Sequence, residues 1–114
     1  MQFENGVTLK KNMDFRDIYR KGKSCANRDL VIYVRKNNIG QNRIGFSVSK
    51  KVGNSVVRNR VRRLMKESYR LNCCTIKSGY DIIFISRVAA KDADYKAVEK
   101  SMKNLFKRAS ILKG

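Results

Sequence analysis

The sequence predicts a single α+β domain in which helices cover one sheet. Strand-like hydrophobic patterns occupy residues 28–35, 43–49 and 80–87, and a helical period occupies 13–21, 56–71 and 95–109. A chain of 114 residues is long enough for one domain with one core. The residues alone therefore give the order helix, strand, strand, helix, strand, helix. That order is typical of a sandwich of a sheet and its helices, spanning 1–114 as one unit.

The first predicted helix, 13–21, carries Phe15, Ile18 and Tyr19 at i, i+3 and i+4, so the three share one face. Core packing is the simplest role for such a face. Gly22 follows where a helix usually ends. The polar segment before the helix is expected to be loosely held, as chain termini often are.

Three strands follow from the remaining patterns. The strands 28–35 and 43–49 are separated by a connection rich in Asn and Gly, so we expect them to pair as an antiparallel hairpin. The strand 80–87 is apolar on both faces, which indicates a central strand that is covered on both sides. Asp94 can cap a final helix, whose buried stripe is expected to hold Tyr95, Val98, Met102, Leu105, Phe106 and Ala109.

The helix 56–71 separates an apolar face from a cationic one. Asn54 or Ser55 can cap its first turn. The apolar face is expected to hold Val57, Val61, Leu64, Met65, Ser68 and Leu71. The opposite face holds Arg58, Asn59, Arg62, Arg63, Lys66 and Arg70. Four of these cations recur every four residues, a spacing at which like charges repel, so we infer that a polyanion neutralises them.

The charge of the whole chain supports the same inference. Its 27 Lys and Arg against 9 Asp and Glu give a net charge of +18. Such a charge opposes folding and favours a polyanionic partner, either nucleic acid or an anionic membrane. The apolar helix stripes are sized for a core, which disfavours a membrane. Because neither a membrane span nor a signal peptide is apparent, we expect a cytoplasmic protein.

Protein-based catalysis is not expected. The chain has no His and its acids are dispersed, whereas phosphodiester hydrolysis needs a general base or carboxylates that hold metal ions. Cys25, Cys73 and Cys74 lack the spacing of a zinc site and are expected to stay reduced. We therefore predict no catalytic residue and no metal site in the chain itself.

One ordered string of residues carries a specific resemblance. It reads Gly45-Phe46-Ser47-Val48-Ser49-Lys50-Lys51-Val52-Gly53-Asn54, followed by Val57-Arg58-Asn59-Arg60-Val61. This string resembles the bacterial ribonuclease P protein subunit, a family in which the Arg-Asn-Arg helix is a signature. The similarity covers nearly the whole chain, since it continues at Lys10-Lys11-Asn12, Asp14-Phe15, Ala26-Asn27-Arg28 and Tyr80-Asp81-Ile82.

The resemblance implies an αβββαβα order of the ribosomal protein S5 domain 2-like type, with a four-stranded sheet and a left-handed βαβ crossover. The residues alone do not indicate that handedness, because parallel crossovers are right-handed in about 98% of cases. They also leave the fourth strand open. It could come from a different division of 29–48 or from a short piece near the end of the chain.

The resemblance further implies an RNA-binding subunit of an endoribonuclease. A catalytic RNA subunit would remove the 5′ leader from precursor tRNA, and this chain would bind both the leader and that RNA. Magnesium would lie mainly on the RNA, with no cofactor on the protein alone and no small-molecule substrate. The alternative, which fold and charge do not separate, is a general basic nucleic-acid-binding protein or RNA chaperone with no catalytic complex.

Two RNA-binding surfaces are expected. Guanidinium groups match phosphates, so the surface for the catalytic RNA combines the cationic helix face with the helix entrance. It comprises Lys50, Lys51, Asn54, Arg58, Asn59, Arg60, Arg62, Arg63 and Lys66, with Arg60 nearest the apolar boundary. The leader is single-stranded and suits stacking rings beside polar and cationic groups. This second surface comprises Phe15, Tyr19, Tyr33, Arg43, Ser47 and Ser49, and would form a trough beside Tyr33 if the first two strands pair.

Overall fold

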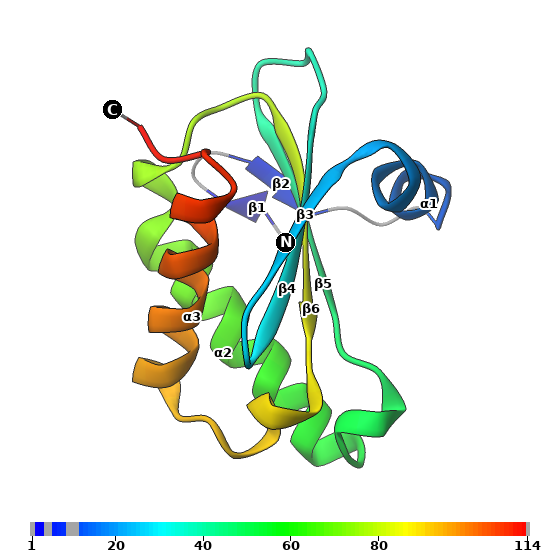
Figure 1. The fold of residues 1–114 in the computed structure, drawn as a ribbon, viewed down its shortest axis with the longest axis vertical. Helices are drawn as coiled ribbons and strands as arrows, with labels where there is room; N and C mark the ends of the chain where they lie inside the picture. Colours follow the sequence, from blue (N-terminus) through cyan, green and yellow to red (C-terminus); the bar gives the residue numbers. More distant parts are fainter. Residues whose placement is uncertain (1, 4–5, 9–11, 114) are drawn as a thin grey trace.

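The fold is one mixed sheet with helices on both of its faces. The computed structural model describes residues 2–3, 6–8 and 12–113, with side chains from residue 15 onward. Helices α2 (Ser55–Asn72) and α3 (Tyr95–Arg108) cover one face of the sheet, and α1 (Asn12–Lys21) lies against the other (Figure 1). The predicted α+β fold is confirmed, and all three predicted helices are present.

The sheet has six strands in the order β1-β2-β5-β6-β4-β3 within the described residues. The strands are β1 (Gln2–Phe3), β2 (Gly6–Thr8), β3 (Lys23–Ala26), β4 (Leu30–Lys36), β5 (Asn42–Ser47) and β6 (Tyr80–Ser86). From α1 onward the elements follow the αβββαβα order that the resemblance implies. Strands β5 and β6 are parallel and are joined through α2. The left-handed sense of this crossover stays a prediction.

The predicted hairpin of β4 and β5 is wrong. Strand β6 lies between them, antiparallel to β4 and parallel to β5, so Tyr33 and Gly45 both pair with Ile83. The physical reason is that β6 is apolar on both faces and gains most from the central position, as its own pattern predicts. The Asn37 N–H, at the start of the β4–β5 connection, donates to the Gly79 carbonyl over 2.9 Å, which holds the connection across the start of β6.

The fourth main strand is β3, which neither of the two alternatives places correctly. It pairs antiparallel with β4 through a tight turn, in which the Asn27 side-chain oxygen accepts hydrogen bonds from the backbone N–H groups of Asp29 and Leu30. Gly22 precedes β3 where the chain passes close to its neighbours. A Cβ there would lie 2.5 Å from the Ile18 carbonyl oxygen and 2.8 Å from that of Val34.

The main core lies between the sheet and the pair α2–α3. Its largest members include Ile32, Ile82, Phe84, Met65, Tyr69, Met102 and Phe106, all fully buried. A smaller cluster on the other face joins Ile18 of α1 to Ile83 of β6. The predicted stripe of α2 is wrong at its end, because Leu71 is 52% exposed. Tyr69 is buried instead, with its ring centroid 6.4 Å from that of Phe46 on the sheet, since this turn of α2 faces β5.

Candidate RNA-binding surfaces

The entrance to α2 brings several predicted residues together. Asn54 is the N-cap, because its side-chain oxygen accepts a hydrogen bond from the Val57 N–H over 3.0 Å. This decides between the two predicted caps and gives Asn54 a structural role. Lys50 and Lys51 lie in a short 3-10 helix, η1 (Lys50–Val52), and are exposed. They therefore lie close in the chain to Arg58 and Asn59, the first residues of the cationic face of α2.

Two cationic side chains of α2, Arg58 and Arg62, form hydrogen bonds within the helix. Arg58 donates to the Ser55 hydroxyl over 3.2 Å, and Arg62 donates to the Asn59 side-chain oxygen over 3.0 Å. Such contacts three residues apart lie along one helix face. We call the α2 cationic face the set Lys50, Lys51, Arg58, Asn59, Arg62, Arg63 and Lys66.

One acid on this helix neutralises only the last cation of the row. Glu67 accepts two hydrogen bonds from Arg70, over 3.2 Å and 2.5 Å. The Arg70 hydrogen bond lowers the pKa of the Glu67 carboxyl, and the same bond raises the pKa of Arg70. Within the described part of the chain, no acid forms an ion pair with Arg58, Arg62 or Lys66. Arg58, Arg62 and Lys66 therefore stand four residues apart without a neutralising acid among the described residues, and the repulsion between them stays a prediction.

Arg60 differs from its neighbours. Its guanidinium donates to the Ala93 carbonyl over 2.7 Å and to the Lys91 carbonyl over 3.3 Å. Those carbonyls belong to the segment that follows β6, which contains the 3-10 helix η3 (Val88–Asp92) and leads into α3. Arg60 therefore ties α2 to the start of α3, in line with its place at the apolar boundary of the helix.

Three of the predicted leader residues form an aromatic cluster between α1 and the sheet. The ring centroids of Tyr19 and Tyr33 lie 5.0 Å apart in an edge-to-face arrangement, and those of Phe15 and Tyr19 lie 6.3 Å apart. We call these three residues the aromatic cleft. Tyr19 is 38% exposed, so part of its side chain reaches solvent. Phe15 and Tyr33 are half-buried against Ile18 and Ile83.

The trough predicted beside Tyr33 is bordered by a different strand, because β6 and not β5 lies next to β4. Ile83 separates Tyr33 from Gly45, so the two strands that were expected to be neighbours are one strand apart. Ser47 is nevertheless on the α1 side and lines a concavity of about 590 Å³ with Phe15, Arg16, Tyr19 and Phe46. Burial raises the pKa of the Tyr19 hydroxyl, the nearby Tyr33 raises it further, and a hydrogen bond with Ser47 opposes the rise. Ser49 lies beyond β5, exposed at the cap of η1.

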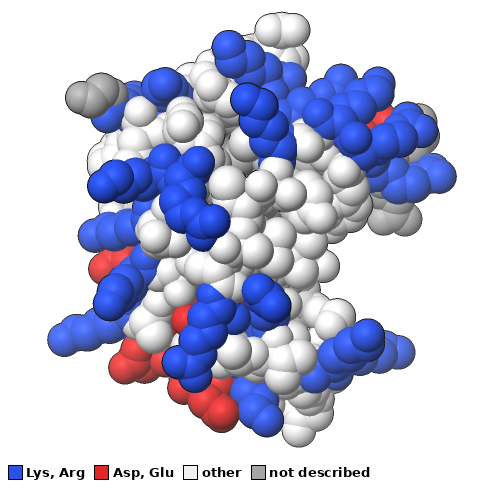
Figure 2. All heavy atoms as spheres, viewed as in Figure 1, with Lys and Arg blue, Asp and Glu red and all other residues white. Residues whose placement is uncertain are grey.

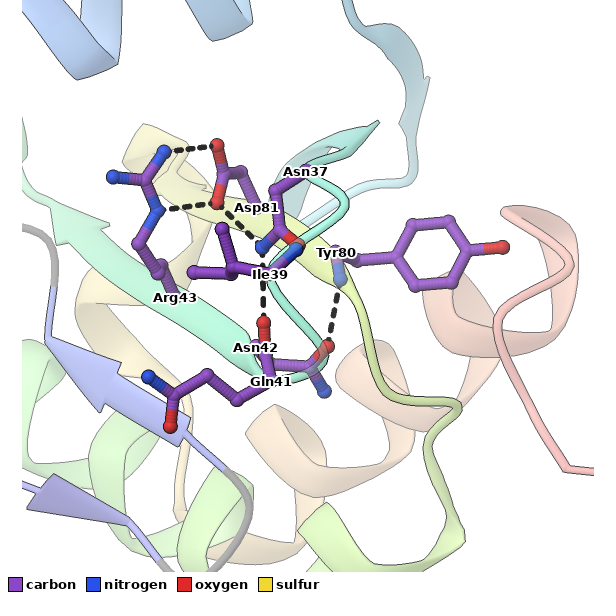
Figure 3. A network of polar contacts seen from close by, with 7 residues as sticks. All are labelled: Asn37, Ile39, Gln41, Asn42, Arg43, Tyr80 and Asp81. Carbon is purple, nitrogen blue, oxygen red and sulfur yellow. Dashed lines mark hydrogen bonds and ion pairs between the residues drawn. The ribbon is translucent and has the colours of Figure 1, made fainter.

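Arg43 forms an ion pair with Asp81 of the neighbouring strand. Its guanidinium donates from Nε to Asp81 Oδ1 over 2.7 Å and from Nη2 to Oδ2 over 2.6 Å (Figure 3). Asn37 also donates to Asp81, over 2.9 Å, and Figure 3 shows the three side chains converging at the start of β6. The sequence analysis missed Asp81, although a lone acid in an otherwise apolar strand is a signal that a partner must be buried with it.

A family model described as ribonuclease P matches residues 3–110. A ribonuclease P protein component of Clostridioides difficile is 57% identical over 112 residues, which covers 97% of this chain and 98% of that protein. The chain belongs to the ribonuclease P protein family. As a member of that family it is a protein component of ribonuclease P, an enzyme of tRNA processing.

Solved structures of the ribonuclease P protein family share the fold. The Staphylococcus aureus RNase P protein superimposes with a TM-score of 0.86 at 40% identity, covering 93% of this chain and 97% of that one. The Thermotoga maritima RNase P protein gives 0.82 at 32% identity, covering 94% and 98%. The predicted membership in this family is confirmed by these likenesses.

The face of this ribonuclease P protein drawn in Figure 2 carries many more cations than acids. Figure 2 shows Lys and Arg spread over the visible face, while Asp and Glu gather mainly near the start of α3. In the described part of the chain, no helix is long and apolar enough to cross a membrane. Among the same residues, no three His, Cys, Asp or Glu side chains lie close enough to hold a metal ion.

Proposed function

We propose that this chain is the RNA-binding subunit that helps a catalytic RNA to remove the 5′ leader from precursor tRNA. One observation carries the proposal beyond family membership. The chain presents two chemically different surfaces. One is the cation row on α2, in which Arg58, Arg62 and Lys66 have no acidic partner among the described residues, and the other is the cluster of aromatic rings beside α1. Folded RNA offers dense phosphates, and a single strand offers exposed bases, so the two surfaces suit two kinds of RNA segment.

The α2 cationic face is proposed to bind the catalytic RNA subunit. Arg58 and Arg62 are pre-oriented by their contacts with Ser55 and Asn59, which reduces the entropy lost when they meet phosphates. Neutralisation by phosphates would also relieve the repulsion along the row. Binding to each phosphate releases counterions, so binding through this face should depend steeply on salt.

The aromatic cleft is proposed to bind the leader. Tyr19 is partly exposed and lines the same concavity as Arg16, so a base and its phosphate could be held together. Stacking of a base on an aromatic side chain is worth about 1–3 kcal/mol and tolerates different sequences. The protein would act by holding substrate and RNA together in the cytoplasm, while the magnesium that the reaction needs would lie mainly on the RNA.

The alternative is a general RNA chaperone that has the same charge but no specific complex. The two functions differ in specificity, because only the proposed subunit should act selectively with the ribonuclease P RNA. The test is cleavage of precursor tRNA by a ribonuclease P RNA at low magnesium, with and without the protein. The proposal expects strong stimulation by this protein and little by an unrelated basic protein of similar charge. Equal stimulation by both would favour the chaperone.

A further inference from the structure

A second basic surface lies at the end of the molecule away from the start of α2. A concavity of about 270 Å³ is lined by Lys21, Lys23, Val34, Arg35, Lys36, Tyr80, Ala109 and Ser110. These residues come from the ends of α1 and α3, the start of β3, the end of β4 and the start of β6. We call Lys21, Lys23, Arg35, Lys36 and Tyr80 the distal basic concavity.

Its position separates it from the α2 cationic face. The molecule extends over 36 × 30 × 24 Å along its principal axes. In Figure 1, drawn with the longest axis vertical, η1 and the start of α2 lie at the bottom, while the end of α3 and the β4–β5 connection lie towards the top. One protein can therefore offer cations at both ends of its long axis.

The four cations of the concavity are not neutralised by the residues that the structure describes. The side chains of Lys21, Lys23, Arg35 and Lys36 have no ion pair or hydrogen bond to any of those residues. Asp81 is paired with Arg35 in the sheet register, but its carboxylate oxygens are bonded to Arg43 and Asn37. Several cations around one concavity, with no acid of the described residues bound to them, repel one another unless an anion joins them.

Two simpler roles for these cations are less suitable. Cations near a helix C-terminus stabilise its negative end, and α3 ends beside the concavity. However, Lys107 and Arg108 already occupy the last turn of α3 and can meet that need. Lysines on an edge strand also prevent aggregation, which could explain Lys23 of β3 but not Lys21 or Lys36.

Tyr80 packs against the main core and also lines the concavity, to which it can add a hydroxyl. Figure 3 shows its ring pointing away from the Arg43–Asp81 network, with the hydroxyl at the outer end. That hydroxyl has no hydrogen-bond partner among the residues that the structure describes. Ammonium groups and a phenolic hydroxyl are suitable donors to phosphate oxygens.

We propose that the distal basic concavity binds the phosphate backbone of an RNA strand, at a site separate from the α2 cationic face and the aromatic cleft. This inference rests on the proposed function for the identity of the RNA. The phosphates belong either to the RNA subunit or to the tRNA part of the substrate. The chemistry is the same in both cases, so the experiment has one arm for each source.

The test compares two variants that lose the same charge. Lys21→Gln/Lys23→Gln/Lys36→Gln removes three cations from the concavity, and Lys91→Gln/Lys96→Gln/Lys100→Gln removes three exposed cations around the start of α3. Binding of wild type and both variants is measured as a function of KCl concentration. The first arm uses the full-length ribonuclease P RNA, and the second uses precursor tRNA binding to the assembled holoenzyme. Thermal melting by circular dichroism checks that each variant is folded.

The expected result is a lower salt slope for the concavity variant in one of the two arms. Removing three cations that each bind a phosphate should reduce the slope by about 2 to 3 and weaken binding by roughly 10- to 100-fold near physiological salt. The α3 variant should keep a slope close to that of wild type. The arm that responds identifies the source of the phosphates. Restoring the cations as Lys21→Arg/Lys23→Arg/Lys36→Arg should restore binding.

Equal slopes for the two triple variants in both arms would overturn the inference. That outcome differs from a failure of the proposed function, in which wild-type protein would neither bind the ribonuclease P RNA specifically nor stimulate cleavage. Tyr80→Phe gives a finer measurement. It should weaken binding in the responding arm by less than the triple variant does and leave the salt slope unchanged, because no charge is lost.

Discussion

Arg43 and Asp81 form a two-pronged ion pair across neighbouring strands, with N–O distances of 2.7 Å and 2.6 Å. The Asp81 side chain is only 4% exposed and the Arg43 side chain 30% exposed. A buried pair adds little net stability compared with apolar residues, but removing one partner leaves a buried charge uncompensated. The pair therefore fixes the register of β5 against β6 on the face that carries the aromatic cleft.

Removal of Arg43 should be costly and should depend on Asp81. We expect Arg43→Met to lower the free energy of unfolding by about 2–4 kcal/mol, because Asp81 would keep only Asn37 as a donor. The double variant Arg43→Met/Asp81→Asn should lose less than the sum of the two single variants. Urea denaturation of wild type, the two single variants and the double variant gives the four free energies of unfolding of this double-mutant cycle. Additive losses would show that the pair is not coupled. Arg70→Met, which breaks an exposed pair, is the control and should change little.

The cations of α2 should act on binding and not on folding. Arg62→Ala/Lys66→Ala removes two charges that have no acidic partner among the described residues, so the melting temperature should stay nearly constant. The salt slope for binding the ribonuclease P RNA should fall by roughly 0.7 to 0.9 for each phosphate that is no longer neutralised. Lys96→Ala/Lys100→Ala, on α3, is the matched charge control. An unchanged slope in the α2 variant would mean that this face only meets solvent.

Arg60 should behave in the opposite way, although it belongs to the same Arg-Asn-Arg string. Its bonds to the Ala93 and Lys91 carbonyls join α2 to the segment before α3. We expect Arg60→Ala to lower stability by about 1–2 kcal/mol, because two carbonyls lose a charged donor. The salt slope of RNA binding should remain that of wild type. A lower slope with unchanged stability would instead place Arg60 at the RNA.

The sequence predicts well those features that depend on residues close together in the chain. Asn54 and Asp94 cap their helices as the local patterns indicate, and Asp94 accepts from the Ala97 N–H over 2.8 Å. The central position of β6 follows from its apolar faces. Pairing between distant segments is not local, which explains why the hairpin of β4 and β5 is wrong and why β3, only four residues long, escapes notice.

The same limit applies to the candidate sites. The Arg43–Asp81 pair joins residues 38 apart in the chain, and the Arg60–Ala93 bond joins residues 33 apart. Sequence patterns assign both arginines to RNA surfaces because they do not show the partners within the protein, which are the Asp81 carboxylate for Arg43 and two backbone carbonyls for Arg60. The RNA contacts of both arginines stay predictions. By contrast, Phe15, Tyr19 and Tyr33 come together as predicted, despite the different strand order.

Catalysis should require the RNA subunit. The chain has no His, and no cluster of acids that could hold a metal lies within the residues that the structure describes. Protein that has been treated with nuclease and repurified should not cleave precursor tRNA at any magnesium concentration. Adding the ribonuclease P RNA should restore cleavage. Substantial cleavage by the RNA-free protein, measured with end-labelled precursor, would be incompatible with a catalytic centre in the RNA.

Leader binding should depend more on Tyr19 than the sequence alone indicates. The ring of Tyr33 packs against the buried cluster of Ile18 and Ile83 and against Tyr19. Tyr33→Ala should therefore lower stability as well as binding. Tyr19 is more exposed, so Tyr19→Ala should lower the melting temperature less than Tyr33→Ala does while it removes a ring on which a base can stack. Binding of precursor tRNA to the holoenzyme should weaken by about 1–3 kcal/mol.

The comparison that isolates the leader uses mature tRNA as the control ligand. Mature tRNA lacks the leader, so its binding to the holoenzyme should be the same for wild type and Tyr19→Ala. Tyr19→Phe keeps the ring and loses only the hydroxyl that lies beside Ser47, so it should bind precursor tRNA almost as wild type does. If Tyr19→Ala weakened precursor and mature tRNA equally, the ring would act on the RNA subunit or on folding. The leader would then have to bind elsewhere on the protein.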